Sequence, residues 1–210
     1  MILTPIADAD LPAILDRFET ALADHPIATG ALRLIATTVP LGAKGPPSGR
    51  LYQDQVRQGV ELAHAFGIQT LDEEPAVAFS WDGVCIRTRS EPSVVIHEVT
   101  HWLVCSAERR RLYDFGLGAG PETGRAAEAD AVCPLDWEAR QREECLASLL
   151  GILWEAELGQ AAILAFLEQN WLEGHERPAT RAHFIDIVQS LHAMRLVDDH
   201  GHPVGPPAPH

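Results

Sequence analysis

The feature that most constrains this chain is the segment VVIHEVTHWL at residues 94–103. It places His97 and His101 four positions apart, with Glu98 directly after the first histidine. Two side chains at this spacing project from one face of an α-helix, so both imidazoles can converge on a single cation. The flanking residues are apolar, and Glu98 is the only acidic or basic residue between 92 and 107 apart from the histidines. The sequence therefore predicts a buried helix from about Pro92 to Ser106 that carries two metal ligands.

A site of this kind needs a third protein ligand, with positions left open for water or substrate. The best source is the apolar-patterned segment 136–158, which is expected to form a long helix. Glu144 lies at the edge of its apolar stripe, whereas the neighbouring Glu143 aligns with the more polar side. The pattern favours Glu144 as the third ligand and leaves Glu143 as the alternative. Glu128 and Asp130 are weaker candidates.

Two histidines and a carboxylate can support two kinds of metal chemistry. With zinc, the metal activates a water molecule, and Glu98 would serve as the general base of a peptidase. With ferrous iron, the same three ligands leave positions for dioxygen and substrate, and the chemistry is oxygenation. A third possibility is a binding module that keeps the metal only for stability. The spacing alone does not separate these readings.

The rest of the chain predicts an α+β domain that is mostly helical, with a small β-sheet beside the HExxH helix. Apolar residues recur at helical spacing in several segments, and Gly- and Pro-rich stretches separate them. Helices are expected at 10–23, 51–66, 92–106, 136–158, 160–172 and 180–196, a strand at 31–39, a β-hairpin at 75–90, a loop at 41–50 and irregular structure at 109–134.

The composition limits the kinds of binding partner and the cellular location that can be expected. The net charge of −14 disfavours nucleic acid and anionic membranes as main partners, because like charges repel at long range. No apolar run is long enough to cross a bilayer, and the N-terminus has no signal-peptide pattern. The four cysteines form no C-x-x-C pair, which favours reduced thiols. A cytoplasmic protein is the expectation.

The stretch after the motif carries a resemblance. Residues 97–116 read HEVTHWLVCSAERRRLYDFG, and residues 121–125 read PETGR. This resembles the elongation factor P hydroxylase family, in which HE-x-x-HW is followed by a short apolar segment, a paired arginine, a DFG and a Pro-acid-Gly-Arg turn. Downstream, Glu144 to Gly159 align with the helix that carries that family's third ligand. The similarity is strongest over 97–125, and LGAG at 117–120 replaces an aromatic and cysteine-bearing segment of the family.

The resemblance implies a zincin-like fold and a non-haem metal hydroxylase that acts on a modified lysine of elongation factor P or on a related substrate. It implies Fe(II), with Zn²⁺ as the alternative, and O₂ as co-substrate. Residues 1–75 carry no recognisable similarity and are expected to form a helical and strand segment of unknown role, packed on the same core. Residues 76–197 are expected to form the metal-binding, hydroxylase-like domain, and the chain end at 198–210 is expected to be a flexible tail. The resemblance carries over His97, His101 and Glu144 as metal ligands. It implies that Glu98 either supports a ligand or metal-bound water from beside the site or acts as an acid–base residue, and that Asp114 and Arg125 lie at the site mouth.

Overall fold

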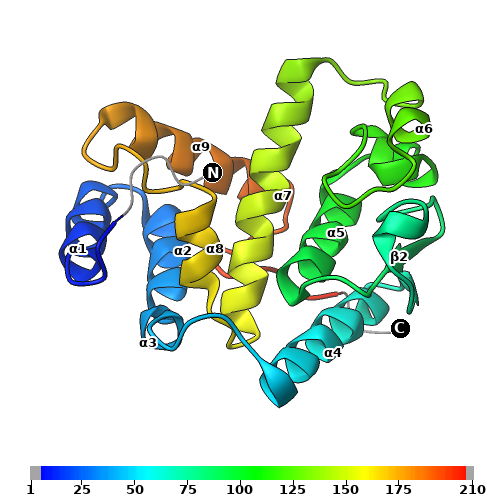
Figure 1. Ribbon diagram of the computed structural model, residues 1–210. Coiled ribbons are helices and arrows are strands. Elements are labelled where there is room, and N and C mark those ends of the chain that lie inside the picture. The colour runs from blue at the N-terminus through cyan, green and yellow to red at the C-terminus, as the bar shows by residue number, and fades with distance from the viewer. Residues whose placement is uncertain (1–5, 207–210) are drawn as a thin grey trace. The chain divides into compact units, whose positions relative to one another are not determined.

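The computed structural model describes residues 6–206, which divide into two compact units (Figure 1). The first unit holds residues up to Pro47 together with Ser148–Gly205, and the second holds Ser48–Ala147 together with Pro206. The segment 1–75, expected as one N-terminal piece, is thus shared between both units. Helices dominate, and a two-stranded sheet accompanies them, which agrees with the expected α+β class. The zincin-like character stays a prediction.

The first unit is a helical assembly. It contains α1 (Leu11–Ala21), α2 (Pro26–Ala36), α3 (Val39–Gly42), α8 (Ala162–Glu168), α9 (Pro178–Ala193) and the C-terminal part of α7 (Trp137–Glu157). Helix α2 packs against α1, α8 and α9. The core contains Phe18, Phe166 and Phe184, whose rings meet edge to face: Phe184 lies 5.7 Å from Phe18 and 6.0 Å from Phe166 between centroids. Such aromatic pairs add to the stability gained from burial alone.

The strand expected at 31–39 is wrong. Residues 31–36 belong to helix α2, and Val39 begins the short helix α3. The buried positions Ala28, Ala31, Leu32 and Ile35 recur at helical spacing, and Pro26 stands in the first turn, where its missing N–H costs nothing. The helical spacing of the buried positions therefore explains why this segment is a helix and not a strand.

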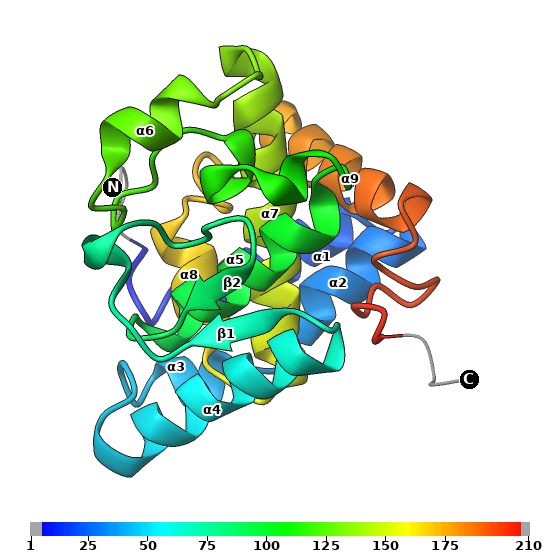
Figure 2. The same ribbon diagram turned by 90° about the vertical axis from the view of Figure 1, so that its right-hand side faces the viewer.

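The second unit surrounds the HExxH helix. It contains α4 (Gly49–Ala65), β1 (Gln69–Leu71), β2 (Cys85–Arg87), α5 (Pro92–Val104), α6 (Ala126–Ala131), the start of α7 and the 3₁₀ helices η1 (Pro75–Val77), η2 (Arg109–Arg111) and η3 (Tyr113–Gly116). Helix α5 packs against α4 and β2, so the expected sheet beside the motif helix is confirmed (Figure 2). Gly59 of α4 allows the close approach, because a Cβ there would lie 3.2 Å from Val95 Cγ1.

The hairpin expected at 75–90 is wrong in its first half. Strand β2 pairs in parallel with β1, with Thr70 opposite Ile86, and residues 75–77 form a 3₁₀ helix instead of a strand. The tight turn is present: the Asp82 side chain accepts hydrogen bonds from the Val84 and Cys85 amides, both at 3.0 Å. Only the single antiparallel bridge between Trp81 and Ile86 remains of the expected ladder. A tight turn therefore precedes β2, as a hairpin requires, but the pairing partner of β2 lies earlier in the chain.

The remaining segments follow the sequence pattern more closely. Residues 109–134 are mostly irregular, with short helical turns and α6. In the segment expected as a flexible tail, Val197 pairs with Pro203, and His202 Nδ1 lies 2.8 Å from a Glu157 carboxylate oxygen. Residues 207–210 of that tail lie outside the described residues. Within 6–206, none of the helices has the length and apolarity that a membrane span requires.

Candidate metal centre

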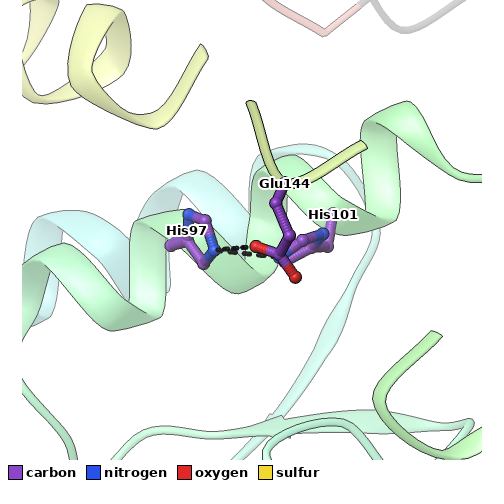
Figure 3. A group of neighbouring side chains, drawn as sticks. All are labelled: His97, His101 and Glu144. Carbon is purple, nitrogen blue, oxygen red and sulfur yellow. Dashed lines mark hydrogen bonds and ion pairs between the residues drawn. The ribbon is translucent and has the colours of Figure 1, made fainter. Parts of the chain in front are cut away.

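Helix α5 places His97 and His101 side by side (Figure 3). Pro92 stands in its first turn, and Val95, Ile96 and Val99 are fully buried on the opposite face, which fixes the helix in the second unit. The two imidazoles therefore point to one spot, as their spacing predicts. Their exposure differs: the His101 side chain is 5% exposed, whereas that of His97 is 29% exposed.

The third member of the group, Glu144, comes from the first part of α7. This helix is tied to α5 by Thr100, whose hydroxyl donates to the carbonyl oxygen of Ala147 at 2.9 Å in a fully buried contact. Glu144 Oε2 then lies 3.5 Å from Nε2 of His97 and 3.5 Å from Nε2 of His101 (Figure 3). The structure thus brings together the three residues expected as ligands.

The separations fit a shared cation. The two Nε2 atoms lie 2.9 Å apart, and the three donor atoms all lie within 4.8 Å of one another. Donors at about 2.1 Å from a metal ion, with angles of about 90–110° between them, stand about 3.0–3.5 Å apart. Two imidazole nitrogens and one carboxylate oxygen are also a donor set that zinc and ferrous iron both accept. The group is therefore a possible metal-binding site on both geometry and chemistry.

The protonation states favour metal binding as well. Burial lowers the pKa of His101, and the neighbouring His97 lowers it further, so the ring is held neutral. Burial raises the pKa of Glu144, but hydrogen bonds and charge interactions with His101 and His97 outweigh it, and the pKa lies well below its ordinary value. A metal requires deprotonated ligands, so a neutral imidazole and an ionised carboxylate are the forms that bind.

The group also keeps an open side. The Glu144 side chain is 45% exposed. Within residues 6–206, no fourth histidine, cysteine or acidic residue joins the three. Structural zinc sites close their coordination with four protein ligands, whereas catalytic sites keep a position for water or substrate. The arrangement therefore has the ligand count of a catalytic centre.

Glu98, the expected acid–base residue, is partly buried on α5 beside the group. Burial raises its pKa well above the ordinary value, and the charges of Asp114, Glu144 and Glu122 add to this effect. Glu98 therefore has acidic neighbours on three segments of the second unit and favours the neutral form there.

Asp114, expected at the site mouth, holds a strained turn. Its Oδ1 accepts hydrogen bonds from the amides of Ser80 at 3.1 Å and Trp81 at 3.2 Å, and its Oδ2 accepts one from the Thr123 hydroxyl at 2.6 Å. Burial raises the pKa of Asp114 despite these bonds. Asp114 and Phe115 have φ values of 41° and 54°, a region that non-glycine residues rarely adopt. The carboxylate thus joins three segments around the turn.

The turn places Phe115 beneath the motif helix. Its ring stacks on Trp81, with centroids 5.1 Å apart, and on the His101 imidazole at 5.7 Å. The side chain is 1% exposed, and Gly116 follows with a φ of 68°. The DFG segment is therefore a turn that packs an aromatic ring under α5.

Arg125 and the weaker acidic candidates form contacts with other residues. Arg125 pairs with Glu128, with Nε 2.6 Å from Oε1, and its guanidinium lies 5.4 Å from the centre of the Phe79 ring. Asp130 Oδ1 accepts a hydrogen bond from the Ala119 amide at 2.9 Å. Neither Glu128 nor Asp130 belongs to the metal-binding group. The role of Arg125 at the site mouth stays a prediction.

Sequence reasoning missed two polar partners in this unit. Glu143 is buried and forms an ion pair with Arg109, and Ser90 donates a hydrogen bond to Glu122. The sequence pattern predicts Glu143 on the polar side of α7, which is wrong, because the side chain is buried. No local pattern signals its burial, because the cation that pairs with it, Arg109, lies 34 residues away in sequence.

Comparisons with protein-family models, curated proteins and solved structures found no match to this chain.

Proposed function

We propose that this protein is a non-haem iron-dependent hydroxylase that acts on a protein side chain or a related substrate. The observation that carries the proposal is the meeting of His97, His101 and Glu144 around one point. Two histidines and one carboxylate form the ligand set of non-haem Fe(II) oxygenases. The resemblance of residues 97–125 to elongation factor P hydroxylases supports iron over zinc and supports a modified lysine of elongation factor P as the first substrate to test.

The open side supports an enzyme over a binding module that keeps a metal for stability. A metal held only for stability is usually enclosed by four protein ligands. Here the exposed carboxylate of Glu144 and the partly exposed His97 leave the group accessible. When bound, Fe(II) would supply the redox chemistry that activates dioxygen.

The proposed reaction balances with a reductant. One oxygen atom of O₂ enters a C–H bond of the substrate to give C–OH, and the other leaves as water with two protons and two electrons. The two electrons come from an external donor, such as a small-molecule reductant or an electron-transfer protein. The substrate carbon and this donor are oxidised, and O₂ is reduced.

Other residues of the second unit would orient the ligands, transfer protons and border the substrate. Phe115 and the buried face of α5 keep His101 dry and fixed in orientation. Glu98 is placed to hold a proton beside the ligands and to exchange it during turnover, since groups close to a reacting centre act as general acids and bases. The turn tied by Asp114 and Thr123 would border the substrate, together with the LGAG segment at 117–120.

A zinc peptidase is the second candidate. The same three ligands match the His₂Glu set of catalytic zinc sites, and Glu98 follows the first histidine as the general base of such peptidases does. In that case Glu98 would take a proton from water, so Glu98→Gln would abolish cleavage. A hydroxylase would keep its metal, and some of its activity, in this variant.

The test is intact-mass analysis of candidate substrates, elongation factor P with its modified lysine first. Protein purified without oxygen is analysed for metal and then incubated with Fe(II), ascorbate as the reductant, and O₂. A substrate that gains one oxygen atom supports the hydroxylase, whereas cleavage fragments support the peptidase. Glu144→Gln should lose the activity. Glu138→Gln is the matched control, since Glu138 is exposed on the same helix. Iron-loaded protein that changes no substrate would contradict the proposal.

A further inference from the structure

Two buried polar atoms beside the metal group lack partners. Within residues 6–206, His101 Nδ1 and Glu143 Oε1 are both fully buried and form no hydrogen bond. A buried polar group without a partner costs about 1–3 kcal/mol, so such atoms are rare in folded proteins. That both occur next to one candidate ligand calls for an explanation.

The contacts of Glu143 place it beside the last turn of α5. Its Oε2 pairs with the Arg109 guanidinium, and Arg109 Nη1 donates to the carbonyl oxygen of Phe115 at 3.1 Å. The Phe115 ring in turn stacks on the His101 imidazole. The negative charge of Glu143 also acts on both His101 and Cys105. Arg109 thus holds one carboxylate oxygen of Glu143, and the other, Oε1, is buried without a partner.

The tautomer of His101 determines whether Glu143 Oε1 can accept a hydrogen bond from the ring. Nε2 of His101 faces His97 and Glu144, so Nδ1 is the nitrogen turned away from the metal group. A neutral imidazole that binds a metal through Nε2 must carry its proton on Nδ1. Metal binding therefore creates a buried donor at Nδ1, and this donor needs an acceptor.

We propose that Glu143 is a positioning residue that accepts a hydrogen bond from Nδ1–H of the metal-bound His101, with Arg109 holding its carboxylate in place. The proposal rests on the metal site proposed above. Metal-bound histidines usually donate their second ring N–H to a carboxylate or carbonyl, which fixes the ring and raises its basicity. Asp114 is not available as this acceptor, because both of its carboxylate oxygens are engaged in the turn.

The test uses Co²⁺ and Zn²⁺ as probes and needs no substrate. Co²⁺ affinity is measured by competition with a chelator, followed by the visible absorption of the bound ion. Glu143→Gln should lower the affinity about 10- to 100-fold and change the absorption spectrum. Glu143→Asp, which keeps a carboxylate, should recover part of the affinity. Glu138→Gln, an exposed glutamate of the same helix, should bind as the parent protein does.

A second measurement on the unmodified protein keeps the proposal testable if Glu143→Gln fails to fold. In Zn²⁺-loaded protein with ¹⁵N-labelled histidine, the proton on His101 Nδ1 should give a downfield, slowly exchanging NMR signal. A fast-exchanging Nδ1–H, or a Glu143→Gln variant that binds Co²⁺ within twofold of the parent with the same spectrum, would overturn the role of Glu143 and leave the metal site intact. A parent protein that binds neither ion would overturn both.

Discussion

Glu155 offers a quantitative test of the first unit that is independent of the metal. It lies on α7 and is 7% exposed, and burial raises its pKa from 4.5 to about 8, with a further contribution from the charge of Glu168. A carboxyl group buried in this way is neutral in the folded protein near neutral pH. The perturbation is Glu155→Gln, which keeps the size and polarity of the neutral acid but cannot ionise.

The sign follows from proton binding. Between pH 4.5 and about 8, the folded state keeps the Glu155 proton while the unfolded state releases it. The free energy of unfolding therefore falls as pH rises through this range. A shift of about 3.5 pH units corresponds to at most about 5 kcal/mol, since each unit is worth about 1.4 kcal/mol. Below the range the contribution is fully present, and above about pH 8 the loss is complete.

Urea unfolding followed by far-UV circular dichroism, near pH 5 and near pH 8, measures this loss. Glu155→Gln should have almost the parent stability at the lower pH and should exceed it by several kcal/mol at the higher pH. Glu176→Gln, at an exposed position of the same unit, controls for the change in net charge. If Glu155→Gln and the parent lose stability in parallel as pH rises, Glu155 is not the buried proton-binding group inferred here.

Three further predictions test other contacts. A saturating metal ion, at about 100 times its dissociation constant, should raise the free energy of unfolding by about 2.7 kcal/mol, and a chelator should reverse this shift in a thermal melt. Phe115→Ala removes a ring that is 1% exposed and should cost about 3–5 kcal/mol in urea unfolding; a loss under 1 kcal/mol would contradict the stack beneath α5. Gly30→Ala would place a Cβ 1.9 Å from the His200 carbonyl oxygen, so it should destabilise the first unit by more than about 1 kcal/mol, whereas Gly205→Ala, with no atom within 4 Å, should be neutral in the same assay.

The local sequence pattern predicted most helices correctly, because the spacing of the apolar residues on the buried face of a helix is visible in the sequence. The segments that became α1, α4, α5 and α7 each carry a buried stripe at helical spacing, and Pro92 marks the start of α5. The same rule corrects the strand expected at 31–39, because Ala28, Ala31, Leu32 and Ile35 recur at helical spacing. The parallel pairing of β1 with β2 was out of reach, since the partner of a strand is set by tertiary packing rather than by local turn chemistry.

For the candidate site, too, local pattern predicted some residues and missed others. His97 and His101 followed from a single helical turn, and Glu144 followed from its place at the edge of the α7 stripe. The burial of Glu143 could not be read from sequence, because its compensating cation is Arg109, which lies 34 residues away. Burying an unpaired carboxylate is costly, so its position makes sense only once the partner is placed.

The pair of Glu143 and Arg109 allows structural support to be separated from ligand positioning. Their side chains are 10% and 13% exposed, so Arg109→Met should leave an uncompensated buried carboxylate and cost about 3–5 kcal/mol in urea unfolding of the metal-free protein. The double variant Arg109→Met with Glu143→Leu removes both charges and should recover most of that stability, because apolar replacement of a buried ion pair is often neutral or stabilising. It should not recover Co²⁺ affinity, because the acceptor for His101 Nδ1 is gone. A double variant that regains both stability and Co²⁺ affinity would show that Glu143 matters only as the partner of Arg109. A double variant as unstable as Arg109→Met alone would show that the uncompensated charge of Glu143 is not the cause of the instability of Arg109→Met.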